Sequence, residues 1–93
     1  MADYTVRVEL RNADWDTYNK LHESMAASGY IRTVVGDDGR RFKLPDAEYV
    51  ASKGGGLNQV RDEVVRIAKA HNSDPSVLVT ECLGRAWLLP FDK

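Results

Sequence analysis

The sequence has few of the residues that mark specialised classes of protein. Its only cysteine, Cys82, has no partner for an intramolecular disulfide, so a reducing compartment is expected. No apolar run approaches the length of a membrane span, and no cationic stretch leads into an apolar one at the N-terminus. We therefore expect a cytoplasmic protein without a signal peptide and without contact with a membrane.

An excess of charge of one sign is also missing. Thirteen Lys and Arg residues stand against fourteen Asp and Glu residues, which gives a net charge of -1. Non-specific coating of nucleic acid depends on a large basic excess, so this function is not expected, although a local basic patch is compatible with the composition. What is present is a chain of 93 residues, 43% hydrophobic and 29% charged, which predicts a single domain over residues 1–93.

The clearest pattern lies at the start of the chain. Apolar and polar residues alternate without a break over residues 4–11. Such a period of two is typical of a strand that packs one face on a core and turns the other to water. Val6 and Val8 are predicted to point inward, and Arg7 and Arg11 outward. Helices on the inner face alone would leave the outer face free to bind a ligand.

The other elements are predicted from periodicity and turn residues. One helix is expected to start from an N-cap within Asn12-Ala13-Asp14 and to end at Gly29, and a second begins at Leu57 and ends near residues 71–73. The order β-α-β-β-α-β predicts an α+β fold, a ferredoxin-like two-layer sandwich whose antiparallel sheet carries both helices on one face. A short extra strand is expected at the C-terminal end. Strands after the first are predicted over residues 30–35, 40–44, 47–52, 76–82 and 85–89.

Several large or reactive side chains have simple structural interpretations. Trp15 and Trp87 are expected in the core, and Cys82 as a small buried apolar residue. Lys53 and the glycines at 54–56, just before the second helix, are compatible with a phosphate loop. They lack the ending of a Walker motif, so a plain connection is the simpler interpretation.

Metal ligands are sparse in this sequence. His22 and the other histidine, His71, are predicted on different helices, and no Cys or His pair has the spacing of a metal site. A magnesium site built from Asp37, Asp38 and Asp46 is conceivable, but carboxylates in turns are more often only solvated. We expect neither a metal nor another cofactor.

Two groups of residues are candidates for function. His22 lies beside the apolar stripe of the first helix, where it is either a half-buried structural histidine or a general acid or base. The basic residues of the hairpin and the first strand are either solvated or a surface that binds RNA phosphates. These RNA-binding candidates are Arg7, Arg11, Arg32, Arg40, Arg41 and Lys43.

Four short stretches carry a family resemblance. They are Tyr4-Thr5-Val6, Leu21-His22-Glu23-Ser24-Met25, the glycine turn at residues 36–39, and Leu44 to Tyr49. With them the chain resembles the endoribonuclease antitoxins of type V toxin–antitoxin systems, the GhoS-like proteins. The resemblance covers residues 4–51 without gaps and the second helix more loosely. It implies a ferredoxin-like fold similar to that of the Cas2 proteins of CRISPR systems, and cleavage of the messenger RNA that encodes a toxin.

The resemblance also implies a site. A basic residue on the first helix and an aromatic residue on the third strand matter in the family, and these positions fall on His22 and Tyr49. The first of them is arginine in the characterised member. Cleavage would then need no metal: His22 would act as acid and base on the ribose 2′-hydroxyl, with Arg7 or Arg11 as the phosphate clamp. Tyr49 would stack on or orient the substrate.

A second interpretation is open at this stage. A ferredoxin-like domain without catalytic activity would pair with another protein, or with itself, through the open sheet or the edge of the hairpin. The expected state is a monomer or a weak homodimer.

Overall fold

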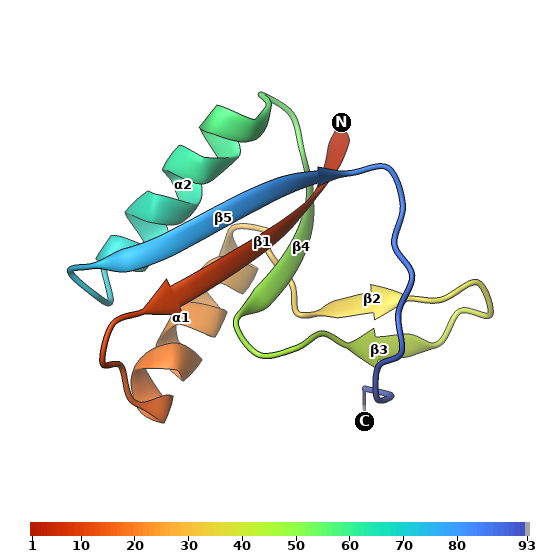
Figure 1. Cartoon of the computed structure of the whole chain (residues 1–93), viewed down its shortest axis with the longest axis horizontal. Helices are drawn as coiled ribbons and strands as arrows, with labels where there is room; N and C mark the ends of the chain where they lie inside the picture. The colour runs from red at the N-terminus through yellow and green to blue at the C-terminus, as the bar shows by residue number, and fades with distance from the viewer. Residues whose placement is uncertain (93) are drawn as a thin grey trace.

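A three-stranded antiparallel sheet and a two-stranded hairpin, with two helices, make up residues 1–92, the part of the chain that this computed structural model describes. Both helices lie on one face of the larger sheet, and the hairpin extends from its side (Figure 1). The α+β class is therefore confirmed. In chain order the elements are β1 (Ala2–Leu10), α1 (Trp15–Ala27), β2 (Thr33–Val35), β3 (Arg41–Lys43), β4 (Glu48–Lys53), α2 (Leu57–Lys69) and β5 (Pro75–Cys82).

The first strand is the centre of the larger sheet. The strand order is β4-β1-β5, and Val6 lies opposite Tyr49 on one side and Val79 on the other. The alternation predicted for β1 is confirmed, because every second side chain is buried against the helices. The main core consists of Tyr4, Val6, Val8, Leu10, Leu21, Met25, Tyr30, Tyr49, Ala51, Val60, Val64 and Ala68.

Local signals set the ends of the helices as predicted. Asp14 caps α1, since its carboxylate accepts a hydrogen bond from the Thr17 amide at 2.8 Å. The chain leaves α1 through Gly29 at a φ of 90°, and α2 begins after Gly56 at a φ of 86°. Neither helix within residues 1–92 has the length and apolarity needed to cross a bilayer.

The prediction of a C-terminal strand at residues 85–89 is wrong. This segment leaves β5 as an extended chain and follows no strand edge until it reaches β3 (Figure 1). There the Lys43 amide donates to the Pro90 carbonyl at 2.9 Å, and Phe91 forms an isolated bridge with Phe42. Arg85 ties the segment to β1 by donating to the Thr5 hydroxyl at 3.1 Å. Residues 85–89 have the composition of a strand, but within residues 1–92 no strand edge lies beside them to pair with. They therefore form an extended strap.

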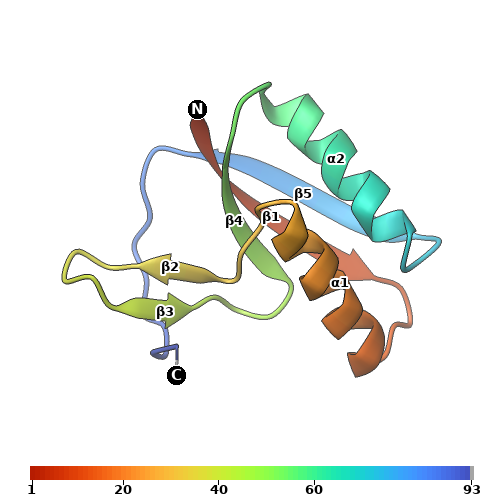
Figure 2. The same ribbon diagram turned by 180° about the vertical axis from the view of Figure 1, so that it is seen from behind.

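The outer face of the sheet is only partly free, which corrects the expectation of an open face. A second small core, formed by Val34, Leu44 and Val50 with Phe42 and Leu89 packed against it, covers the face at β4. The C-terminal segment and the hairpin supply this cover, and the view from behind shows the C-terminal segment on the side away from the helices, with the hairpin beside the sheet (Figure 2). The face remains open where β1 and β5 meet.

The tryptophans are not in the core, contrary to expectation. Trp15 is 80% exposed and Trp87 is 37% exposed, with its ring 5.7 Å from that of Phe42. Trp15 is the first residue of α1 and lies about 100° around the helix from the buried side. Cys82 is half-buried, and its sulfur lies 3.0 Å from the Thr5 hydroxyl.

Candidate functional site

His22 and Tyr49 meet where α1 crosses β4. Tyr49 points inward opposite Val6 and is fully buried, so only its hydroxyl reaches towards the edge of the helix layer. That oxygen lies 2.5 Å from His22 Nδ1, and the two ring centroids are 5.6 Å apart. The Tyr18 ring lies 6.3 Å from the His22 ring. The structure therefore brings together the two residues assigned to catalysis.

Both members of this pair are neutral near pH 7. Burial lowers the pKa of His22 below its ordinary value, and the nearby charge of Arg32 lowers it further. Burial raises the pKa of Tyr49 to about 12. Among residues 1–92 the Tyr49 hydroxyl has His22 Nδ1 as its single hydrogen-bond partner, and the tautomer of the imidazole decides which of the two atoms donates.

The second nitrogen of His22 is available to a ligand. His22 Nε2 makes no hydrogen bond within residues 1–92, and it is not among the buried side-chain atoms that lack a partner. Hence it reaches solvent. An imidazole held at one nitrogen and free at the other is oriented for proton donation or proton transfer at the free one.

The charges of two cations reach this imidazole. The charges of both Arg32 and Lys43 act on His22, while that of Asp46 opposes them. Arg32 pairs with Asp46 at 3.5 Å, yet its Nε is buried and finds no hydrogen-bond partner in the described part of the chain. Lys43 is exposed and forms no ion pair with residues 1–92. The local potential is therefore positive in a protein of net charge -1.

The other two hairpin cations are partly engaged. Arg41 shares one face of β3 with Lys43 and donates to the Thr33 hydroxyl at 3.3 Å. Arg40 pairs with Asp38 at 3.3 Å and lies over the ring of Phe91. These two side chains extend the basic surface along the hairpin, away from His22.

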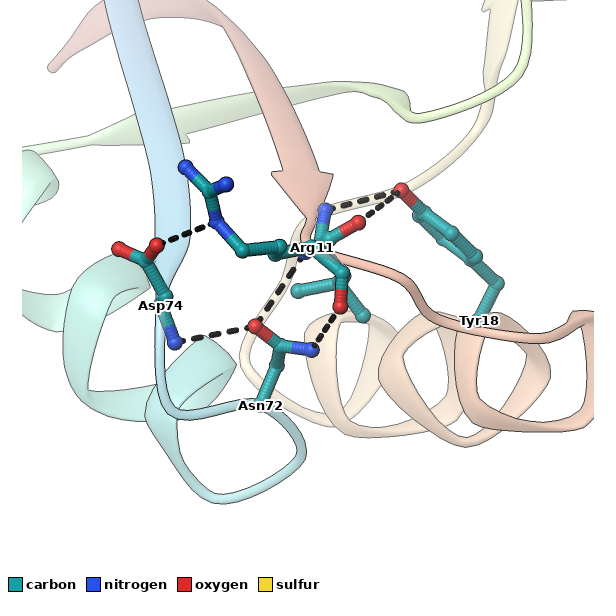
Figure 3. Close-up of polar contacts among 5 residues, drawn as sticks. Arg11, Tyr18, Asn72 and Asp74 are labelled. Atoms are coloured by element: carbon teal, nitrogen blue, oxygen red, sulfur yellow. Dashed lines mark hydrogen bonds and ion pairs between the residues drawn. The ribbon is translucent and has the colours of Figure 1, made fainter.

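The cations of β1 do not join His22. Arg7 lies on the opposite face of the sheet, 3.3 Å from Glu9 and 3.6 Å from Glu48. Arg11 follows the strand and pairs with Asp74 at 2.5 Å, and Asn72 bonds its backbone (Figure 3). The same view shows Tyr18 bonded to the backbone at the end of β1. Neither arginine is placed to hold a phosphate at His22.

His71 and the segment at Lys53, two features that the sequence analysis singled out, both have structural roles. His71, after α2, bonds the Ser24 hydroxyl at 2.9 Å and so joins the two helices. Lys53 lines a hollow of about 550 Å³ beside Gly54 and Gly55, just before α2. Its ammonium lies 3.2 Å from Glu63 and over the Tyr30 ring, which places it in a local ion pair.

Sequence reasoning gave two residues of this region other roles, Asp46 as a conceivable magnesium ligand and Trp15 as a core residue. Asp46 moderates the positive charge near His22, and Trp15 is exposed on α1. Trp15 and His22 are seven residues apart, and this helical spacing was the available signal. Within residues 1–92 no three His, Cys, Asp or Glu side chains are grouped closely enough to hold a metal ion. No protein-family model matches the chain, and a search of curated proteins found no significant match.

Proposed function

We propose that this protein binds and cleaves RNA, as an endoribonuclease of the kind found among type V antitoxins. The observation that carries the proposal is the imidazole of His22, fixed by Tyr49 at one nitrogen and open at the other, with the charges of Arg32 and Lys43 acting on it. Such a group with adjacent cations suits a phosphodiester, whose charge the cations offset while the imidazole moves a proton.

The proposed fold is ferredoxin-like. Ile31 and Val50 exchange both backbone hydrogen bonds, at 3.0 and 2.8 Å, on the edge of β4 that faces away from β1. Across the sheet the order is then the chain at Ile31, β4, β1 and β5. This order supports a β-α-β-β-α-β sandwich in which the hairpin β2–β3 is an insertion between the second and third strands.

The proposed reaction is transfer within the RNA chain. The ribose 2′-oxygen attacks the adjacent phosphorus while its proton passes to His22 Nε2, and the bond from phosphorus to the 5′-oxygen breaks. The proton then passes from Nε2 to the departing 5′-oxygen, which leaves a 2′,3′-cyclic phosphate and a 5′-hydroxyl. Tyr49 serves Nδ1 as hydrogen-bond donor or acceptor, so it supports both tautomers of His22. Arg32 and Lys43, rather than Arg7 or Arg11, hold the phosphate.

The test is cleavage of a panel of single-stranded RNAs, with and without a chelator, by the wild-type protein and two histidine variants. We expect His22→Ala to lose at least about a hundredfold in rate, the lower end of the contribution of a general acid or base. His71→Ala is the matched control, since its partner Ser24 lies away from Tyr49, and it should keep its activity. Equal cleavage by His22→Ala, or no cleavage of any RNA by the wild type, contradicts the proposal.

A protein-interaction role is the second candidate, and one observation favours it. β5 is an edge strand whose outer side pairs with no strand in residues 1–92, and Leu78 on it is 64% exposed. Pairing of two copies along β5 would make a homodimer. Sedimentation across a range of protein concentrations separates this role from that of a monomeric ribonuclease.

A further inference from the structure

The exposure of Trp15 is not explained by the fold. Its side chain is 80% exposed on the first turn of α1, although tryptophan usually has much of its surface buried. A single exposed apolar side chain is common on protein surfaces and means little alone. What sets Trp15 apart is its alignment with the site.

Trp15 lies on the same flank of α1 as His22. Seven residues are almost two full turns, so the two side chains lie within about 20° of each other around the helix and about 10 Å apart along it. Tyr18 stands between them, and its ring is 6.3 Å from that of His22. An aromatic row therefore leads from an exposed tryptophan to the imidazole.

The charges along this flank suit an anionic ligand. Asn19 and Ala26 are the other residues of this row, so the row carries no carboxylate. Asp16 points about 100° away from Trp15 around the helix and pairs with Lys20 at 3.4 Å. Arg32 and Lys43 lie at the His22 end, where Asp46 is the one opposing charge identified. A ligand that is anionic near His22 and flat and apolar near Trp15 matches both ends.

We propose that Trp15 is a stacking platform for an unpaired base of an RNA whose phosphate lies at His22. This inference rests on RNA being the ligand of the proposed function, and it names the substrate class as single-stranded RNA. Bases in a duplex are already stacked and are not free to lie on a side chain, whereas the bases of a single strand stack readily on exposed aromatic rings.

The experiment measures binding of a short single-stranded RNA whose riboses carry 2′-O-methyl groups, so that cleavage by the 2′-oxygen cannot occur. The background variant Trp87→Phe leaves Trp15 as the only tryptophan. We expect the RNA to quench its fluorescence and Trp15→Ala, in the wild-type background, to raise the Kd about tenfold, within the range found for base–aromatic stacking. Trp15→Phe should recover part of the affinity.

Three comparisons decide the outcome. Leu83→Ala, at a fully exposed residue beyond β5, should leave the Kd unchanged. An abasic strand of the same length should bind equally to the wild type and to Trp15→Ala. A Kd unaffected by Trp15→Ala, or equal quenching by a duplex, overturns the inference. Thermal melts of each variant show that it is folded, and little change is expected because Trp15 is exposed.

The two proposals can fail separately. If His22→Ala and the wild type cleave RNA equally while Trp15 still stacks on single strands, only the ribonuclease assignment falls. If His22 proves essential for cleavage while Trp15→Ala binds the methylated RNA as the wild type does, only the stacking role falls.

Discussion

At the residue scale, the environment of His22 sets the pH behaviour of the site. Burial and the charge of Arg32 hold its pKa below the ordinary value of 6.5. The unfolded chain, with the ordinary value, therefore binds more protons than the folded protein in the window just below pH 6.5. The free energy of unfolding falls as the pH falls through that window, and the stability from the neutral imidazole is present above it.

Replacing Arg32 by glutamine tests this account of His22. We expect the pKa of His22 to rise, because a repelling cation is removed while the carboxylate of Asp46 still favours the charged imidazole. Titration of the imidazole by NMR measures the change. Arg61→Gln is the control, because Arg61 pairs with Asp62 at 2.9 Å on α2, and it should not move the pKa of His22. A pKa that stays put or falls in Arg32→Gln contradicts the assignment of Arg32 to the site.

At the element scale, the connection into α2 depends on backbone conformation more than on side chains. The Gly56 φ of 86° lies in the left-handed region, where residues with a Cβ are strained, and this residue sets the direction in which α2 starts. Gly54 is two residues earlier and is outside that region. In both places a Cβ would meet nothing within 4 Å.

Alanine at these two glycines gives a matched comparison. Gly56→Ala should lower the free energy of unfolding by about 1–3 kcal/mol, the cost of a positive φ with an extended ψ, a combination essentially confined to glycine. Gly54→Ala should be neutral or stabilising by up to about 1 kcal/mol, because it restricts only the unfolded chain. Urea denaturation monitored by circular dichroism measures both. Equal destabilisation would mean that contact with the side chain, and not φ, sets the cost.

At the scale of the whole molecule, the C-terminal segment joins the hairpin to the sheet. Leu89 packs on the second core, while its neighbour Leu88 is 99% exposed. The same segment bonds the backbone of Lys43 through the Pro90 carbonyl. A cation of the candidate site is thus held in part by residues far along the chain.

Serine at Leu89 and at Leu88 should have unequal effects. Leu89→Ser removes apolar packing and should cost about 1–3 kcal/mol, whereas Leu88→Ser should change stability by less than about 0.5 kcal/mol. Chemical denaturation gives the two values. Hydrogen exchange should also show faster exchange of the Lys43 amide in Leu89→Ser alone. Similar behaviour of the two variants would show that the segment does not hold the hairpin.

Much of the fold was predictable because its signals are local. The alternation in β1, the capping by Asp14 and the left-handed turns at Gly29 and Gly56 depend on neighbours a few residues away. The candidate site was predictable only in its parts, since His22 and the hairpin cations were identified without their mutual geometry.

The sequence was sufficient for the α+β class, the main elements and the inward face of β1, since backbone propensity and hydrophobic period act over a single turn or strand. Tertiary structure decided that Trp15 is exposed and that residues 85–89 form a strap in place of a strand. It also brought Arg32 and Lys43 within range for their charges to act on the imidazole. These outcomes depend on which surfaces pack together across the sheet, and no local pattern encodes contact between segments that are distant along the chain.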